Sequence, residues 1–386
     1  MKELADIIAL ARAQRIEHAA LATVVRIEGS SYRRPGASLY VGADGRRLGS
    51  VSGGCLERDV EKNAKEVLAS GEPRLVIYDT REDSDMVFGT ALGCGGLVEI
   101  FIERLPLQDE RGPVARWAAG ADRRETLVEL MIVAAPSSAP LTVGQRAWVD
   151  IATKKVDATA PNGSASAGAI ESFVSTLMNE GQPLIDARQS GLVTHTTPAG
   201  DVRAFVRVIE PPVRLVICGA GDDAQPLARM AHTLGWRVWV LDHRAAFATR
   251  ERFPDAERVE VVVAGTLPSD LTLDPRTVAV IMNHHYPSDG AWLSALASLP
   301  ITYLGLLGAR HRSARLLRDA ELPPPGPGGL PHLFAPAGLD LGAEGPEGIA
   351  LAMLAEMQSV IAGRRGGRLR ESSSPIQQTP LEVSAG

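Results

Sequence analysis

The stretch Arg214–Ala224, RLVICGAGDDA, decides the fold of the C-terminal part of the chain. An apolar run leads directly into closely spaced glycines, and a helical pattern follows as far as Leu234. A second apolar run, Arg237–Leu241, ends at Asp242, about twenty residues beyond the first glycine, which is the spacing of a dinucleotide fingerprint. In that fingerprint the glycines allow a tight turn and a close approach of pyrophosphate to a helix N-terminus.

Apolar strands and helices alternate regularly from Val213 onward, which predicts a Rossmann-like, doubly wound parallel sheet. Ligands of such sheets bind beyond the carboxyl ends of the strands. The candidate nucleotide-binding residues of this region are therefore Gly219, Gly221, Asp222, Asp242, His284, His285 and Arg310.

Some charges around this glycine turn favour nucleotide binding and others oppose it. Asp222 and Asp223 stand where they would repel an incoming pyrophosphate. Asp242 favours an unphosphorylated ribose, whereas the adjacent Arg244 would accept a 2′-phosphate. We therefore expect NAD-type binding, if a nucleotide binds at all.

A second organising stretch is Gly49–Glu57, GSVSGGCLE, which places Cys55 just before an expected helix, Arg58–Ala69. The unpaired amides and the positive dipole of a helix N-terminus favour a thiolate, so Cys55 is a candidate soft ligand or nucleophile. The alternative is a small, buried and inert thiol.

A second cysteine, Cys94, lies in another glycine-rich loop, 93–96. Two thiols and the amides of flexible glycines can converge on one anionic, soft-metal ligand, which makes Cys94 and Cys55 candidate metal ligands. Tight turns without any ligand are the alternative. The loop residues assigned to this site with the two cysteines are Ser52, Gly53, Gly54, Gly93 and Gly95.

The chain divides into four parts by its pattern. We expect a smaller α/β domain at 1–110, a middle α/β region at 111–210, the Rossmann-like domain at 211–364, and a disordered polar tail at 365–386. The segment 179–186 echoes 69–79, each after a helix, so the middle region is a candidate degenerate repeat of the first domain without its cysteines.

The composition is that of an ordinary globular protein, with 386 residues and a net charge of −6. Interspersed charges do not support nucleic-acid or membrane binding. We expect a cytoplasmic protein, because apolar runs are short, the N-terminus does not resemble a signal peptide, and three cysteines form no disulfide framework.

Taken in order, these motifs resemble the XdhC/CoxI family of accessory proteins for xanthine dehydrogenase and related molybdenum hydroxylases. The likeness covers Gly29–Gly96, with GSVSGGCLE and GCGG, and Val213 to about Gly363, with GLDLGAE near the end. The chain departs from the family at Asp222, where a histidine often follows the glycines, and at Gly345 and Gly348.

The resemblance implies binding of the molybdenum cofactor, its protection during sulfuration, and its handover to an apo-hydroxylase. Cys55 and Cys94 match the family's two glycine-flanked cysteines, and Cys94 is the first choice for cofactor contact. Thiolates suit a soft, sulfur-rich centre, while Ser52, Arg33, Arg34 and the loop amides are suited to the pterin's phosphate.

Three functions remain open on the sequence. The first is a non-catalytic cofactor chaperone whose partners are the apo-enzyme and a sulfurtransferase, and which forms a homo-oligomer. The second is an NAD(P)-dependent oxidoreductase that uses His284 or His285 as acid/base and Arg310 as substrate anchor. The third is an assembly module that docks a partner enzyme and binds no small molecule.

Overall fold

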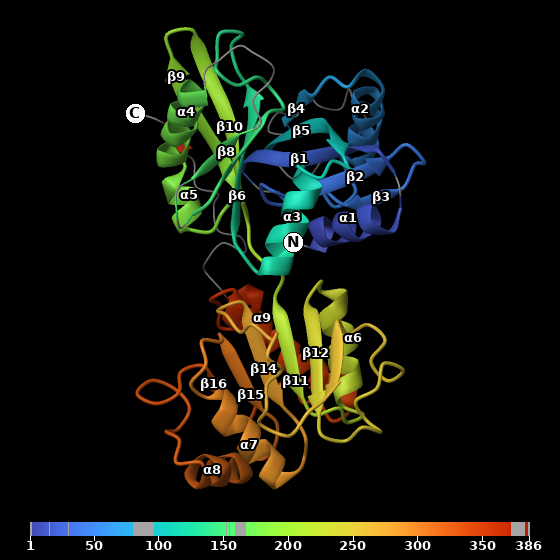
Figure 1. The fold of residues 1–386 in the computed structure, drawn as a ribbon, viewed down its shortest axis with the longest axis vertical. Coiled ribbons are helices and arrows are strands. Elements are labelled where there is room, and N and C mark those ends of the chain that lie inside the picture. The colour runs from blue at the N-terminus through green and yellow to red at the C-terminus, as the bar shows by residue number, and fades with distance from the viewer. Residues whose placement is uncertain are drawn as a thin grey trace. The chain divides into compact units, whose positions relative to one another are not determined.

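The computed structural model describes residues 2–14, 16–29, 31–79, 96–151, 153, 155–158, 167–371 and 383–384. The chain folds into two compact units (Figure 1). One comprises Met1–Pro211 with Gln377–Gly386, and the other comprises Pro212–Ile376. None of the helices in the described ranges is long and apolar enough to cross a membrane.

The first unit begins with an antiparallel sheet of order β3-β2-β1-β5-β4. Its strands are β1 (His18–Glu28), β2 (Ser38–Gly42), β3 (Arg47–Gly49), β4 (Arg74–Asp79) and β5 (Leu97–Pro106). Helix α1 (Lys2–Ala13) precedes β1, and α2 (Glu57–Ser70) connects β3 to β4. Alternation along β1 turns Ala20 and Val24 toward α2 and Leu21 and Val25 toward the other face.

A second sheet of order β17-β9-β10-β6-β7-β8 follows. Its strands are β6 (Leu127–Ala134), β7 (Arg146–Val149), β8 (Val156–Ala158), β9 (Gly191–Thr197), β10 (Gly200–Ile209) and β17 (Val383–Ser384). Its helices are α3 (Pro113–Arg123), α4 (Ala167–Glu180) and α5 (Gln182–Asp186). Written from the other edge, the second sheet has the order β8-β7-β6-β10-β9, which matches β3-β2-β1-β5-β4 of the first sheet strand for strand. In each half a helix follows the third strand in the chain, α2 after β3 and α4 after β8, which is the arrangement an internal repeat produces.

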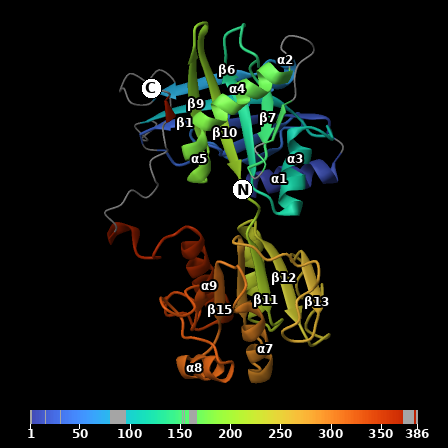
Figure 2. The same ribbon diagram turned by 60° about the vertical axis from the view of Figure 1, so that its left-hand side comes forward.

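The two sheets pack face to face, with α2 on the outer face of the first and α4 on that of the second (Figure 2). Phe101, Met131 and Phe205 fill part of the layer between the sheets. Buried charges fill another part, where Arg146 pairs with both Glu103 and Glu129. Such pairs make the packing specific, because loss of one partner leaves an uncompensated buried charge.

The second unit contains a parallel sheet of order β13-β12-β11-β14-β15-β16, which confirms the predicted Rossmann-like, doubly wound fold. Its strands are β11 (Arg214–Cys218), β12 (Arg237–Asp242), β13 (Arg258–Val261), β14 (Thr277–Ile281), β15 (Tyr303–Leu306) and β16 (Leu333–Phe334). Apolar side chains pack α6 (Ala224–Thr233) and α9 (Pro346–Ile361) on one face. They pack α7 (Tyr286–Leu296) and α8 (Arg310–Asp319) on the other (Figure 1).

The tail expected to be disordered contains two short described elements. A 3₁₀ turn spans Leu369–Glu371. Val383 and Ser384 pair in parallel with Val193 and Thr194 of β9. Backbone pairing of this kind needs no apolar pattern, and therefore the polar composition of the tail gave no sign of it.

Candidate functional site

The loop Gly49–Glu57 is organised by the carboxylate of Glu57, the first residue of α2. That carboxylate accepts hydrogen bonds from the N–H groups of Val51, Ser52, Gly53 and Gly54 at 3.1, 2.9, 3.1 and 2.8 Å, and from the hydroxyls of Ser50 and Ser52. Burial alone would raise the pKa of Glu57, but these hydrogen bonds outweigh it and lower the pKa to about 2. The amides of Ser52, Gly53 and Gly54, which sequence reasoning assigned to a ligand, are therefore held by the chain's own carboxylate.

Cys55 is exposed in this loop, two residues ahead of α2. Cys55 is therefore not the buried, inert thiol that was the alternative. Cys218, by contrast, is buried at the end of β11, and burial raises the pKa of its thiol. Cys94, Gly93 and Gly95 lie outside the described residues, so the pairing of the two thiols stays a prediction. No cluster of three His, Cys, Asp or Glu residues suited to a metal occurs in the described part of the chain.

Gly53 connects this loop to Tyr32. A Cβ at Gly53 would lie 2.8 Å from Cδ1 of Tyr32, and the φ of Gly53 is +93°. The position therefore requires glycine for two reasons, close approach and a backbone conformation that other residues rarely adopt. The ring of Tyr32 thus rests against the backbone of the cysteine loop.

Tyr32 also lines a pocket of about 410 Å³ that contains both arginines assigned from the sequence, Arg33 and Arg34. Arg33 pairs with Glu3, while Arg34 is exposed. Two further arginines line this pocket, Arg188 before β9 and Arg207 in β10. We call it the arginine pocket, and both sheets of the first unit contribute to it.

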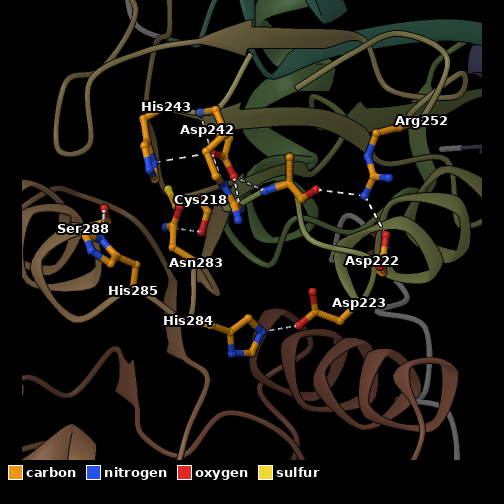
Figure 3. Close-up of polar contacts among 12 residues, drawn as sticks. Cys218, Asp222, Asp223, Asp242, His243, Arg252, Asn283, His284, His285 and Ser288 are labelled. Atoms are coloured by element: carbon orange, nitrogen blue, oxygen red, sulfur yellow. Dashed lines mark hydrogen bonds and ion pairs between the residues drawn. The ribbon is translucent and has the colours of Figure 1, made fainter. Parts of the chain in front are cut away.

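The second unit brings the glycine turn and the carboxyl end of β12 together (Figure 3). The carboxylate of Asp242 is fully buried and accepts hydrogen bonds from Ala220 N–H at 2.6 Å and from Arg244 N–H, Nε and Nη2 at 2.8, 2.9 and 2.6 Å. Four hydrogen bonds use the four lone-pair positions of a carboxylate. A ribose hydroxyl would have to displace Arg244 to reach Asp242.

The glycine turn itself fits the fingerprint geometry only in part. Gly219 has φ +126°, and a Cβ there would lie 2.6 Å from the carbonyl oxygen of Met282, so the turn packs tightly on the end of β14. Asp222, which follows the second glycine of the turn, Gly221, forms an ion pair with Arg252 at 2.8 Å. This ion pair offsets part of the negative charge expected to repel pyrophosphate.

His284 and His285 turn to different partners (Figure 3). His284 Nε2 lies 2.7 Å from Asp223 Oδ2, and this hydrogen bond raises the pKa of His284. His284 has φ +57°, an uncommon conformation for a residue other than glycine. His285 Nδ1 lies 2.8 Å from Ser288 Oγ.

Helix α8 joins this edge of the sheet through Arg312. Arg312 Nη2 donates to the buried carboxylate of Asp289 at 2.6 Å, and Asp289 accepts from Asn283 N–H at 3.2 Å. Arg310, the residue assigned from the sequence, begins α8 and is exposed.

Sequence reasoning missed four residues that shape the two sites: Glu57, Arg188, Arg207 and Arg252. Glu57 had a usable signal, because an acidic residue in the first turn of a helix after a glycine loop readily accepts amides. The arginines had none, since each acts through residues distant in sequence.

These features define a class: a protein with an exposed cysteine in an α/β unit of two sheets, followed by a Rossmann-like unit. Two family models match the chain, one described as the XdhC and CoxI family at residues 12–79 and one as the XdhC Rossmann domain at residues 215–357. The chain belongs to the XdhC and CoxI family.

Full-length relatives agree with that membership. The chain is 32% identical over 343 residues to a Bacillus subtilis (strain 168) protein named as a probable xanthine dehydrogenase subunit, covering 88% of this chain and 92% of that one. It is 24% identical over 348 residues to the molybdenum cofactor insertion chaperone PaoD of Escherichia coli (strain K12), covering 89% and 83%. A crystal structure described as a xanthine dehydrogenase from Bacillus halodurans has a TM-score of 0.71 at 26% identity, covering 96% and 98%.

Proposed function

We propose that this chain is an accessory protein that binds the molybdenum cofactor and assists its sulfuration and its insertion into a xanthine dehydrogenase-type apo-enzyme. The observation that carries the proposal is the exposed thiol of Cys55 on a loop held by Glu57. Similarity to a molybdenum cofactor insertion chaperone across most of the chain supports it.

The residues of the first unit suit such a cargo. A thiolate is a soft ligand appropriate to a sulfur-rich metal centre. Because Cys55 is exposed, a bulky cargo can reach it without opening the fold. Glu57 fixes the loop amides from 51 to 54, so the thiol is presented from a loop ordered before the cargo arrives.

Cys94 belongs to the same proposal as the second thiol, with the apo-enzyme and a sulfurtransferase as partners. A carrier protein must release its cargo. Contacts from two thiols and a few polar groups permit release more readily than a closed metal site does. The oxidoreductase alternative gains no support from Asp242, whose carboxylate is already fully hydrogen-bonded.

The test is elemental analysis of the full chain purified from cells that make the cofactor, with pterin fluorescence measured on the same samples. We expect molybdenum and pterin in the wild type and their loss in Cys55→Ser and in Cys94→Ala. Cys218→Ala is the matched control, because it removes the buried thiol of the other unit. Absence of molybdenum and pterin from every wild-type preparation would refute the proposal.

The handover step has its own measurement. Loaded wild-type protein is mixed with the apo-form of a xanthine dehydrogenase-type enzyme, and the molybdenum content of each protein is determined after separation. We expect molybdenum to move to the apo-enzyme. Retention of all molybdenum by the loaded protein would contradict the insertion role.

A further inference from the structure

The arginine pocket contains more positive than negative charge. Arg33, Arg34, Arg188 and Arg207 line it against the carboxylates of Glu3 and Glu210. Arg33 pairs with Glu3, and Arg188 donates to Glu210 at 2.7 Å. Among the lining residues this leaves Arg34 without a carboxylate partner, whereas the charge of Arg207 is offset from outside the lining by Glu129, 3.7 Å away.

Arg34 is the accessible part of this excess. Its side chain makes no hydrogen bond or ion pair with any other residue in the described ranges. An arginine that folds back on no carboxylate of its own chain keeps all its donors for a ligand.

Arg207 is the buried part, with 3% of its surface exposed. Its Nη2 donates to Thr23 Oγ1 at 2.7 Å, and the carboxylate of Glu129 lies 3.7 Å from its Nε. Neither Nε nor Nη1 has a hydrogen-bond acceptor within the described part of the chain. Buried donors without acceptors are unfavourable, and an anion that entered the pocket could supply the missing acceptors.

We propose that the arginine pocket binds a phosphoryl group, with Arg34 at its mouth and the positive charge of Arg207 at its base. Planar guanidinium groups match phosphate oxygens in geometry and charge. Only the identity of the molecule that bears this group rests on the proposed function, where it is the phosphate end of the pterin cargo.

Tyr32 lies between the arginine pocket and the loop that contains Cys55. Its ring touches Gly53 on one side and lines the pocket on another. One elongated ligand can therefore place a phosphoryl group in the pocket while its other end extends toward the cysteine loop. The two halves of the repeat would then hold one ligand together, since Arg34 comes from the first and Arg207 from the second.

The test is isothermal titration calorimetry of inorganic phosphate and pyrophosphate into the full chain freed of bound molybdenum and pterin. Whichever anion binds more tightly to the wild type, we expect Arg34→Ala to weaken its affinity by about 10-fold or more, as for loss of a charge-assisted hydrogen bond. Arg47→Ala, an exposed arginine outside the pocket, is the control and should leave the affinity unchanged. Tighter binding of pyrophosphate would indicate a diphosphate ligand, and tighter binding of phosphate a monoester.

Arg207→Met removes the buried charge and should also weaken anion binding. If Arg207→Met fails to fold, Arg34→Ala still tests the proposal. No heat of binding for either anion at millimolar concentration, or equal affinity in wild type and Arg34→Ala, would overturn the inference. Anion binding and molybdenum content are separate measurements. A chain that retains molybdenum but binds neither anion contradicts the pocket alone, whereas a chain that binds an anion but never contains molybdenum contradicts the cargo alone.

Discussion

Glu57→Gln should loosen the cysteine loop without unfolding the unit that carries it. The variant keeps the size of the side chain but replaces one acceptor oxygen by an NH₂ group. That group would face N–H and O–H donors that now donate to the carboxylate, among them Gly54 and Ser52. Two donors facing each other repel, so Gly54 N–H and Ser52 O–H lose the oxygen to which they donate.

The magnitude follows from the pKa of Glu57. The difference between its ordinary pKa of 4.5 and the folded value of about 2 corresponds to ~3 kcal/mol at ~1.4 kcal/mol per pKa unit. Solvent screening in this partly exposed loop reduces the expected loss to ~2 kcal/mol. Because the folded pKa lies below the unfolded one, the contribution is complete above about pH 5 and disappears as the pH falls toward 2.

Hydrogen exchange of the amides of residues 51–54 measures this loss directly. At pH 7 a loss of ~2 kcal/mol in local stability should speed their exchange ~30-fold. Glu66→Gln is the matched control, because Glu66 lies on the same helix and is exposed, with an ion pair to Arg74. Unchanged exchange in Glu57→Gln, or equal acceleration in both variants, would refute the account of how the loop is held.

Two further predictions concern the second unit. Asp223→Asn should lower the pKa of His284 toward ~6.5, read from the imidazole resonances by NMR, and an unmoved midpoint would show that Asp223 does not raise it. Because the folded pKa of His284 is raised, the pair stabilises the protein at low pH, and that contribution is lost as the pH rises through the folded pKa. Gly219→Ala should cost ~2–4 kcal/mol in thermal unfolding, because its Cβ would collide with Met282. Gly290→Ala, which has room within α7, should cost nothing, and equal losses would contradict the argument.

The fold of the second unit could be predicted because its signals are local. The run Arg214–Cys218 and the glycines that follow determine a strand and a turn within a few residues, and the regular alternation of strands and helices predicts a parallel, doubly wound sheet. The hairpin of β2 and β3 is likewise predictable from its turn residues, Ala43–Gly45, and the register of Tyr40 opposite Leu48 confirms it.

The candidate sites were less predictable, because their contacts join distant residues. Thr23 and Arg207 are 184 positions apart, and no periodicity links them. In the middle region, β9 contains threonine and histidine at partly buried positions, so its strand pattern is weak. Arg188 precedes β9 and Arg207 lies near the end of β10, and only the antiparallel pairing of these two strands brings both arginines to the same end of the sheet.

The two halves of the first unit differ in a way that suits the single ligand proposed for the arginine pocket. They have the same strand order, yet the sequence between β8 and α4, which corresponds to the Cys55 loop, contains no cysteine. The second half instead supplies Arg188 and Arg207 to a pocket whose other arginines follow β1. A duplication that kept thiol and arginine in both copies would make two equivalent sites. A thiol in the first half alone, with arginines from both halves, would instead make a single, asymmetric site, and such a site would fix the direction in which an elongated ligand binds.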